Sequence, residues 1–287
     1  MNIILFLNKD LYANLSYNLL KDVLLNHDVR IYYSESVGNQ NKKSTDLLRL
    51  EYFEKDFFSS LLEEFIKPNL LNNNFEFFDA SFNTPRFKPC ADVNSVDFIN
   101  EIKSFEPDLF ISIRFGKIFK DEVIKIPKHG LLNLHSAILP GYRGIMGTLY
   151  ALRNGAKEIG CTLHTIPNSG IDTGEIIDIT KMSVNHNKSL FWHIAKLYPL
   201  GCKLISNALS TLSSGNSIIS TKQDLNEGNY YSLPSETDFE AIKKIGFDLI
   251  NTNDYLEVLD EYILPKLNSN LLIELNLLIE TEMKNKK

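Results

Sequence analysis

Cysteine is scarce in this chain. Among its 287 residues only Cys90, Cys161 and Cys202 are cysteines, and no two of them form a Cys-x-x-Cys pair. Three such cysteines cannot all be paired within the chain, so we expect reduced, buried thiols, which suit the cytoplasm. No group of histidine, cysteine and carboxylate residues has the spacing of a metal site, so we expect no metal.

Long apolar runs and a surplus of basic residues are also missing. No window approaches the roughly 18 apolar residues that a membrane helix needs, and the first ten residues lack the basic start and cleavage site of a signal peptide. We therefore expect a cytoplasmic protein without membrane contact. The net charge is −6, whereas a nucleic-acid-binding face is normally basic. No nucleic-acid partner is expected.

A glycine-rich phosphate loop is absent as well. The first apolar run, residues 3–7, leads into Asn8-Lys9-Asp10 and not into a G-x-G-x-x-G turn. That turn offers no cradle for the pyrophosphate of a dinucleotide, which disfavours a nicotinamide- or flavin-dependent dehydrogenase.

What the chain does contain is an alternation of strand and helix patterns. Short apolar runs predict strands at residues 3–7, 29–33, 75–78, 109–113, 131–135, 161–166 and 175–179. Apolar residues at helical spacing predict helices at residues 12–25, 47–66, 97–105, 146–154 and 190–209, the last of them interrupted by Pro199. This order predicts an α/β fold with a mainly parallel sheet.

A stretch rich in serine and glycine, residues 213–220, marks a boundary between a catalytic domain of residues 1–212 and a small C-terminal appendage of residues 213–287. Helices are predicted in the appendage at residues 238–244 and 268–284. The second helix carries an apolar stripe, formed by Leu271, Leu272, Leu275, Leu278 and Ile279. Packing against the main domain is the favoured interpretation of the stripe, and a dimer contact is the alternative.

Three polar residues form the candidate catalytic constellation. Asn133 and His135 are two apart in a predicted strand, so their side chains share a face, and Asp172 lies in Gly-Ile-Asp-Thr-Gly. An amide can donate a hydrogen bond to the oxyanion of acyl transfer, an imidazole can move a proton, and a carboxylate can orient that imidazole. Taken singly, each of these residue types is most often an ordinary turn or hydrogen-bonding residue.

Together with their neighbours these residues resemble a known signature. The matching segments are Asn133-Leu134-His135-Ser136, Leu139-Pro140, Tyr142-Arg143-Gly144, Thr162-Leu163-His164 and Gly170-Ile171-Asp172-Thr173-Gly174. They are similar to the folate-dependent formyltransferases, a family that includes glycinamide ribonucleotide transformylase, methionyl-tRNA formyltransferase and the sugar N-formyltransferases. The resemblance runs from about residue 107 to residue 179. It implies a Rossmann-like sheet, 10-formyltetrahydrofolate as the formyl donor, and catalytic roles for Asn133, His135 and Asp172.

The resemblance also implies where the folate binds. The two folate loops of the family fall on residues 112–118 and 168–172, which makes Arg114, Phe115, Gly116, Lys117, Ile118, Ser169 and Gly170 the candidate cofactor-binding residues. Gly116 would let the backbone approach a planar ring closely. For Arg114 and Lys117 a solvated loop is the alternative, and His164 is either a core histidine or a site residue.

The acceptor amine is predicted from features outside the catalytic motif. A methionyl-tRNA enzyme would carry a longer and usually basic C-terminal domain, and a glycinamide ribonucleotide enzyme a glycine-rich N-terminal loop. The resemblance therefore favours a homodimeric sugar N-formyltransferase acting on a dTDP-linked amino sugar, best dTDP-4-amino-4,6-dideoxyglucose, for O-antigen lipopolysaccharide or a related surface polysaccharide. Candidate substrate-binding residues are Tyr142, Arg143, Tyr230 and Tyr231. The alternatives are a GDP- or UDP-linked sugar, another amine, methionyl-tRNA, or a folate- or nucleotide-binding protein without catalysis.

Overall fold

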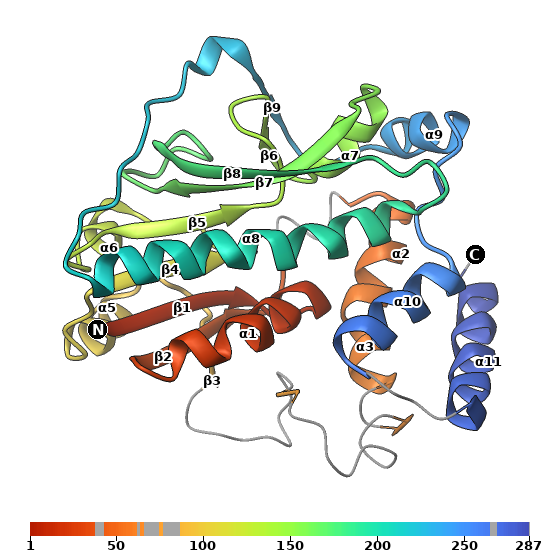
Figure 1. Cartoon of the computed structure of the whole chain (residues 1–287), viewed down its shortest axis with the longest axis horizontal. Coiled ribbons are helices and arrows are strands. Elements are labelled where there is room, and N and C mark those ends of the chain that lie inside the picture. The colour runs from red at the N-terminus through yellow and green to blue at the C-terminus, as the bar shows by residue number, and fades with distance from the viewer. Residues whose placement is uncertain (38–42, 62–63, 66–74, 77–86, 265–268, 287) are drawn as a thin grey trace.

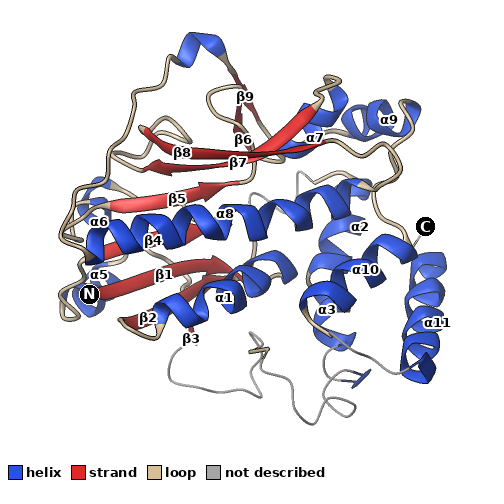
Figure 2. Ribbon diagram, viewed as in Figure 1, coloured by secondary structure: helices blue, strands red, loops and turns tan. Residues whose placement is uncertain are grey.

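The computed structural model describes residues 1–37, 43–61, 64–65, 75–76, 87–264 and 269–286. Its centre is a seven-stranded sheet in the order β3-β2-β1-β4-β5-β7-β8. The four pairings from β3 to β5 are parallel, and the two pairings that add β7 and β8 are antiparallel. The expected α/β fold with a mainly parallel sheet is therefore confirmed (Figures 1 and 2).

The helices and strands follow one another along the described chain as follows. The strands of the large sheet are β1 (Asn2–Asn8), β2 (Asp28–Ser34), β3 (Phe87–Pro89), β4 (Leu109–Ile113), β5 (Leu131–His135), β7 (Glu158–Thr165) and β8 (Ile176–Ser183). The helices are α1 (Leu11–Leu24), α2 (Thr45–Glu54), α3 (Asp56–Leu61), α5 (Val96–Lys103), α6 (Asp121–Ile124), α7 (Gly147–Arg153), α8 (Leu190–Ser213), α9 (Glu236–Lys244), α10 (Thr252–Tyr262) and α11 (Ser269–Asn285). A second, two-stranded sheet pairs β6 (Tyr142–Gly144) with β9 (Asn229–Tyr231) in parallel.

Both faces of the large sheet are covered, and strand β1 shows why its sequence is apolar throughout. Ile3, Leu5 and Leu7 belong to the larger core, on the side of α1 and α8. Ile4 and Phe6 belong to the smaller core, on the side of α5 and α6. A strand buried on both faces has no polar side to alternate with, as expected for the centre of a parallel sheet.

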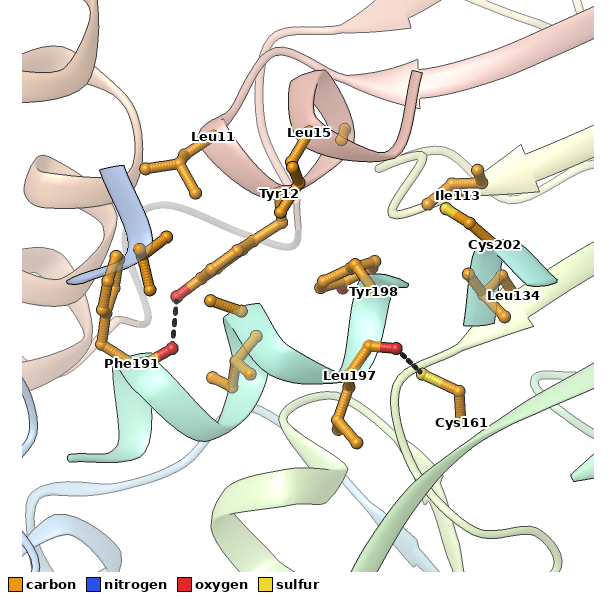
Figure 3. Close-up of a cluster of buried hydrophobic side chains, with 14 of the residues drawn as sticks. Leu11, Tyr12, Leu15, Ile113, Leu134, Cys161, Phe191, Leu197, Tyr198 and Cys202 are labelled. Carbon is orange, nitrogen blue, oxygen red and sulfur yellow. Dashed lines mark hydrogen bonds between the residues drawn. The ribbon is translucent and has the colours of Figure 1, made fainter. Parts of the chain in front are cut away.

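Aromatic and sulfur-containing side chains fill the core between α1 and α8 (Figure 3). The Tyr12 hydroxyl donates to the Phe191 carbonyl at 3.4 Å, and the Tyr12 ring stacks on Tyr198 at 5.4 Å between centroids. Cys161 and Cys202 are buried in the same cluster, and burial raises the pKa of both thiols. They are inert reduced thiols, as the sequence predicts for them.

Several expected elements differ from the observed ones. The helix expected at 47–66 is two helices, α2 and α3, which meet at Lys55, whose ψ of −74° and φ of −126° are not helical. Helix α8 continues through Pro199 as one element. The strand expected at 75–78 is not observed at Phe75 and Glu76, and its remainder lies outside the described residues. Helix α10 was not expected.

The segment after residue 213 packs on the rest of the chain in several places. Strand β9 pairs with β6, and the buried Tyr255 of α10 donates its hydroxyl to the Phe53 carbonyl at 2.9 Å. In α11 the predicted stripe divides, because Leu275 and Ile279 are buried whereas Leu272 and Leu278 are exposed. The division into domains at residue 213 and the homodimer stay predictions. Over the described residues, no helix combines the length and the apolar character of a membrane span.

A buried histidine at the start of α8 makes the stability of the fold depend on pH. His193 Nδ1 lies 2.8 Å from the Ser189 carbonyl oxygen, so it donates, and Nε2 accepts from the Asn185 backbone N–H at 3.1 Å. Burial lowers the pKa of His193 below its ordinary value of 6.5. The unfolded chain therefore binds this proton more readily than the folded protein does.

We expect the stability contributed by neutral His193 to be complete above about pH 7.5 and to be lost as the pH falls below 6.5. At about pH 5.5, one unit below the pKa of histidine in the unfolded chain, the free energy of unfolding is lower by at most about 1.4 kcal/mol. Urea denaturation at the two pH values measures it. His193→Gln should remove this part of the pH dependence, and His129→Gln, at an exposed histidine, should keep it. If the free energy of unfolding changed equally with pH in the two variants, His193 would not be the source of this pH dependence.

Candidate active site

A cavity of about 550 Å³ opens at the carboxyl ends of β1, β4 and β5. Ligands of open α/β sheets bind in this position, and the volume is in the range for small organic ligands. The described residues of its wall come from these strand ends, from helix α2, and from the loops at 114–119, 144–148 and 166–172. Asn133, His135 and Asp172 all line it.

The amide of Asn133 is held by a histidine on the neighbouring strand. Antiparallel register places His164 of β7 directly opposite Asn133 of β5, so their side chains share a face. His164 Nδ1 lies 2.8 Å from the Thr165 carbonyl oxygen and donates to it, which leaves Nε2 to accept from Asn133 Nδ2 at 3.1 Å. The second amide hydrogen of Asn133 then remains for a ligand. Of the two interpretations of His164, the structure supports a role in the site.

His135 ends strand β5 and stands between two acceptors. Its Nε2 donates to the Tyr142 carbonyl oxygen at 2.7 Å, and its Nδ1 lies 3.6 Å from Asp172 Oδ2. A neutral imidazole has only one N–H, whereas both nitrogens face oxygen here. The geometry therefore suits a ring that takes up a proton at Nδ1, next to the carboxylate.

Asp172 connects the two histidines. Its Oδ1 lies 3.4 Å from His164 Nε2, and its Oδ2 accepts from the Gly144 N–H at 2.8 Å. Its backbone φ of 53° is left-handed, a region that aspartate tolerates better than most residues. Burial raises the pKa of Asp172, but its interactions with His135 and His164 and the Gly144 hydrogen bond outweigh burial and lower the pKa to about 2. Asp172 is therefore an ionised carboxylate at neutral pH.

All seven candidate cofactor-binding residues line the same cavity, on two facing loops. Ile118 on one loop and Ile171 on the other are 59% and 39% exposed, which leaves apolar surface for a flat ring. Gly116 packs closely against the backbone of residue 36 in the same chain, because a Cβ at Gly116 would lie 1.9 Å from the Ser36 carbonyl oxygen. No side chain larger than hydrogen fits at this position without moving the loop.

Arg114 lines the cavity, but its guanidinium is engaged within the protein. It donates to Asp10 at 2.7 Å and to Glu54 at 3.1 Å, and its side chain is 18% exposed. The solvated-loop alternative for Arg114 is therefore wrong. Asp10 and Glu54 were not predicted from the sequence, because neither carboxylate stands in a motif and both lie far from Arg114 along the chain.

The four candidate substrate-binding residues lie on the β6–β9 sheet, and the described wall of the cavity includes none of them. Tyr231 is stacked between Tyr142 and Tyr150, with centroid distances of 5.8 and 4.2 Å. Arg143 donates to the carbonyl oxygens of residues 225 and 228. Tyr230 is 52% exposed, and its ring lies 3.1 Å from where a Cβ on Gly144 would be. Since Gly144 lines the cavity, Tyr230 stands at its rim.

Within the part of the chain that the structure describes, no three histidine, cysteine or carboxylate side chains are grouped so that they could hold a metal ion.

Comparison with protein families identifies a formyl transferase domain over residues 72–208. A methionyl-tRNA formyltransferase of Prochlorococcus marinus (strain MIT 9312) is 34% identical over 143 residues, which are 50% of this chain and 40% of the relative. Another, from strain AS9601, is 31% identical over 210 residues, 70% of this chain and 63% of the relative. The chain spans about half the length of the curated relatives it matches.

Solved structures with the same fold include a sugar N-formyltransferase from Shewanella sp FDAARGOS_354, at 19% identity and a TM-score of 0.53, covering 90% of this chain and 88% of that one. An N-formyltransferase from Helicobacter canadensis, solved with folinic acid and dTDP-3-aminofucose, has 20% identity and a TM-score of 0.51 and covers 93% and 85%. At these identities the likeness establishes the fold.

Proposed function

Because this chain belongs to the formyl transferase family, we propose that it transfers a formyl group from 10-formyltetrahydrofolate to the amine of a dTDP-linked amino sugar. The observation that carries the proposal is the convergence of Asn133, His135 and Asp172 on one cavity, with His164 holding the amide. Binding alone does not require an oxyanion donor beside an ionised carboxylate and a histidine, which disfavours a protein without catalysis.

The residues act as follows in the proposed reaction. The acceptor nitrogen attacks the formyl carbon, so that a new carbon–nitrogen bond forms and the bond from that carbon to the donor nitrogen breaks. The free N–H of Asn133 stabilises the negative charge on the formyl oxygen. His135 accepts the proton that the acceptor nitrogen loses and returns it to the departing nitrogen, and Asp172 stabilises the charged ring in between. No covalent bond to the protein is needed.

The cavity wall fits the proposed formyl donor. A pterin is a flat ring with hydrogen-bonding edges, and loops 114–118 and 168–172 offer it apolar side chains and backbone groups. When bound, 10-formyltetrahydrofolate supplies the activated formyl group. Phe115, Gly116, Lys117, Ile118, Ser169 and Gly170 are the residues that we propose to hold it.

Two observations support a sugar over methionyl-tRNA as the acceptor. The chain has a net charge of −6, which is unfavourable for a tRNA backbone. Structural superposition covers 88% and 85% of the two sugar enzymes reported above, and the sequence alignments cover 40% and 63% of the two tRNA enzymes. The best single candidate remains dTDP-4-amino-4,6-dideoxyglucose for surface polysaccharide synthesis. Methionyl-tRNA is the second candidate, because the curated relatives reported above bear that name at higher sequence identity.

Tyr230 is the residue that we propose to contact the nucleotide sugar. We expect Tyr230→Ala to raise the KM for the acceptor by about tenfold, since stacking on a base contributes roughly 1–3 kcal/mol, and to change kcat by less than about threefold. Initial rates at saturating formyl donor measure both constants. The matched control is Tyr33→Ala on β2, a partly buried tyrosine outside the cavity wall described above. An unchanged KM in Tyr230→Ala would refute the contact.

A thermal-shift comparison tests the nucleotide. A ligand that binds only the folded protein raises the melting temperature, and at equal concentration the ligand that binds more tightly raises it more. We expect dTDP to raise it more than UDP or GDP at the same concentration. Equal or absent shifts with all three would contradict a nucleotide-linked acceptor, without bearing on the formyl donor.

A further inference from the structure

Arg114 has an unusual backbone for an arginine. It directly follows β4 and has a φ of 60°, in the left-handed region that residues with a Cβ disfavour. Such a conformation persists where the surroundings hold it, and it commonly occurs at functional sites. Here it turns the chain from the sheet into residues 115–118, the first of the two facing loops of the cavity.

The side chain of Arg114 is fixed from several sides. Nε donates to Asp10 Oδ2 at 2.7 Å, Nη2 donates to Glu54 Oε2 at 3.1 Å, and Nη1 donates to the Tyr198 hydroxyl at 3.1 Å. The guanidinium also lies over the Tyr12 ring, 4.7 Å from its centroid. Figure 3 shows Tyr12 and Tyr198 in the core between α1 and α8. The guanidinium therefore joins β4 to α1, α2 and α8.

A second set of bonds connects the same loop to the strand ends. The Gly116 N–H donates to Ser34 Oγ at 2.8 Å, and the Ser34 hydroxyl donates to Asn8 Oδ1 at 3.0 Å. Asn8 Nδ2 then donates to Asp10 Oδ2 at 2.6 Å, the oxygen that also accepts from Arg114. These hydrogen bonds and the backbone between residues 114 and 116 form a closed ring of connections, which we call the Arg114 circuit. Its members are Arg114, Asp10, Asn8, Ser34 and Gly116. Asn8 and Ser34 are the last residues of β1 and β2.

The charges in this region explain why the guanidinium stays in place. Two buried carboxyl groups, those of Asp10 and Glu54, share the single positive charge of Arg114. Burial raises the pKa of Glu54 to about 8, against the opposing pull of Arg114. The guanidinium is therefore held between two carboxyl groups, of which Glu54 is the one that burial shifts toward its neutral form. Removal of Arg114 would leave Asp10 as a buried charge without its partner.

We propose that Arg114 is a positioning residue, which through the Arg114 circuit fixes residues 115–118 as the cavity wall for the formyl donor. The proposal rests on the proposed function for the identity of that ligand. It replaces the expectation that Arg114 binds the cofactor directly, because each of the three guanidinium nitrogens already donates a hydrogen bond within the protein.

Hydrogen exchange of the unliganded protein tests the positioning role without any assumption about the reaction. We expect the Gly116 amide to exchange at least about tenfold faster in Arg114→Met than in the natural protein. Loss of one hydrogen bond to a charged group corresponds to a factor of this size. Ser34→Ala removes the acceptor of that amide and gives the exchange rate expected when this bond is absent. If Arg114→Met does not fold, Arg114→Lys, which keeps the positive charge, is compared in the same way. The matched control is Arg153→Met, which removes an arginine paired with Asp238 and stacked on Tyr150 outside the cavity wall. Unchanged exchange of the Gly116 amide in a folded Arg114 variant would overturn the proposal, whatever Ser34→Ala shows.

Kinetics distinguish a positioning role from direct catalysis. We expect Arg114→Met to raise the KM for 10-formyltetrahydrofolate by about tenfold to a hundredfold, with partial rescue by Arg114→Lys and a kcat within about threefold. A large loss of kcat at unchanged KM would overturn the positioning role. If the natural protein forms no product with any amine, the proposed function fails, and the exchange experiment still decides whether the circuit fixes the loop.

Discussion

Asp172→Asn should lower kcat for formyl transfer by about 10⁴-fold, the loss seen when an amide replaces the carboxylate that orients the catalytic histidine of a serine protease. Asparagine keeps the size of the side chain and an oxygen for the Gly144 N–H. It loses the negative charge that lies 3.6 Å from His135 and 3.4 Å from His164. Without that charge a protonated His135 is no longer stabilised while it carries the proton between the two nitrogens.

The low pKa of Asp172 makes this variant informative. Because that pKa is lowered to about 2, the carboxylate is ionised at every pH between about 5 and 9, and the loss should be present throughout this range. Mass spectrometry of the product gives the rate, and a thermal melt verifies that the variant folds. Asp178→Asn, at an exposed position of β8, should retain the natural rate. A loss of less than about tenfold in Asp172→Asn would contradict its role.

Asn133→Ala should lower kcat by about 10²–10³-fold and leave both KM values within a few-fold. An oxyanion-hole donor acts on charge that develops in the transition state, and its removal costs this factor. Asn154→Ala provides the control, because that amide donates to the Tyr231 hydroxyl outside the cavity wall. A raised KM at unchanged kcat would instead identify Asn133 as a binding residue.

A double-mutant cycle tests how the amide is held. If His164 acts by orienting Asn133, through the 3.1 Å contact between Nε2 and Nδ2, then His164→Ala should have a smaller effect than Asn133→Ala. The double variant should lose no more activity than Asn133→Ala alone, since residues that act as a unit are not additive. Losses that multiply would indicate that His164 acts on its own, for example through Asp172.

The sequence predicts most of the sheet, and the reason is local. Runs such as residues 109–113 and 131–135 are short, apolar and bounded by polar or glycine residues, and they match β4 and β5 as observed. The break between α2 and α3 was not predictable, because Lys55 carries no helix-breaking side chain. The continuity of α8 through Pro199 equally depends on the packing of α8 against α1 and the sheet, which a local pattern does not contain.

The site residues that lie within sequence motifs were predicted, and the contacts that depend on the tertiary structure were not. Asn133, His135 and Asp172 line one cavity together with both expected folate loops. The pairing of Asn133 with His164 follows from the register of β5 and β7, and spacing alone does not set that register. The Arg114 circuit joins residues more than 100 positions apart, as the Arg114–Asp10 bond shows. Three-dimensional proximity of this kind has no counterpart in a single sequence.

The most direct test of the proposed function is a mass-spectrometric assay with 10-formyltetrahydrofolate and a panel of amine acceptors. The panel contains dTDP-, UDP- and GDP-linked amino sugars and methionyl-tRNA. The account predicts a product in which one formyl group replaces a hydrogen on the amine of a dTDP-linked amino sugar, at a rate that Asp172→Asn abolishes. Formylation of methionyl-tRNA with no product from any nucleotide sugar, or no product from any acceptor, would contradict it.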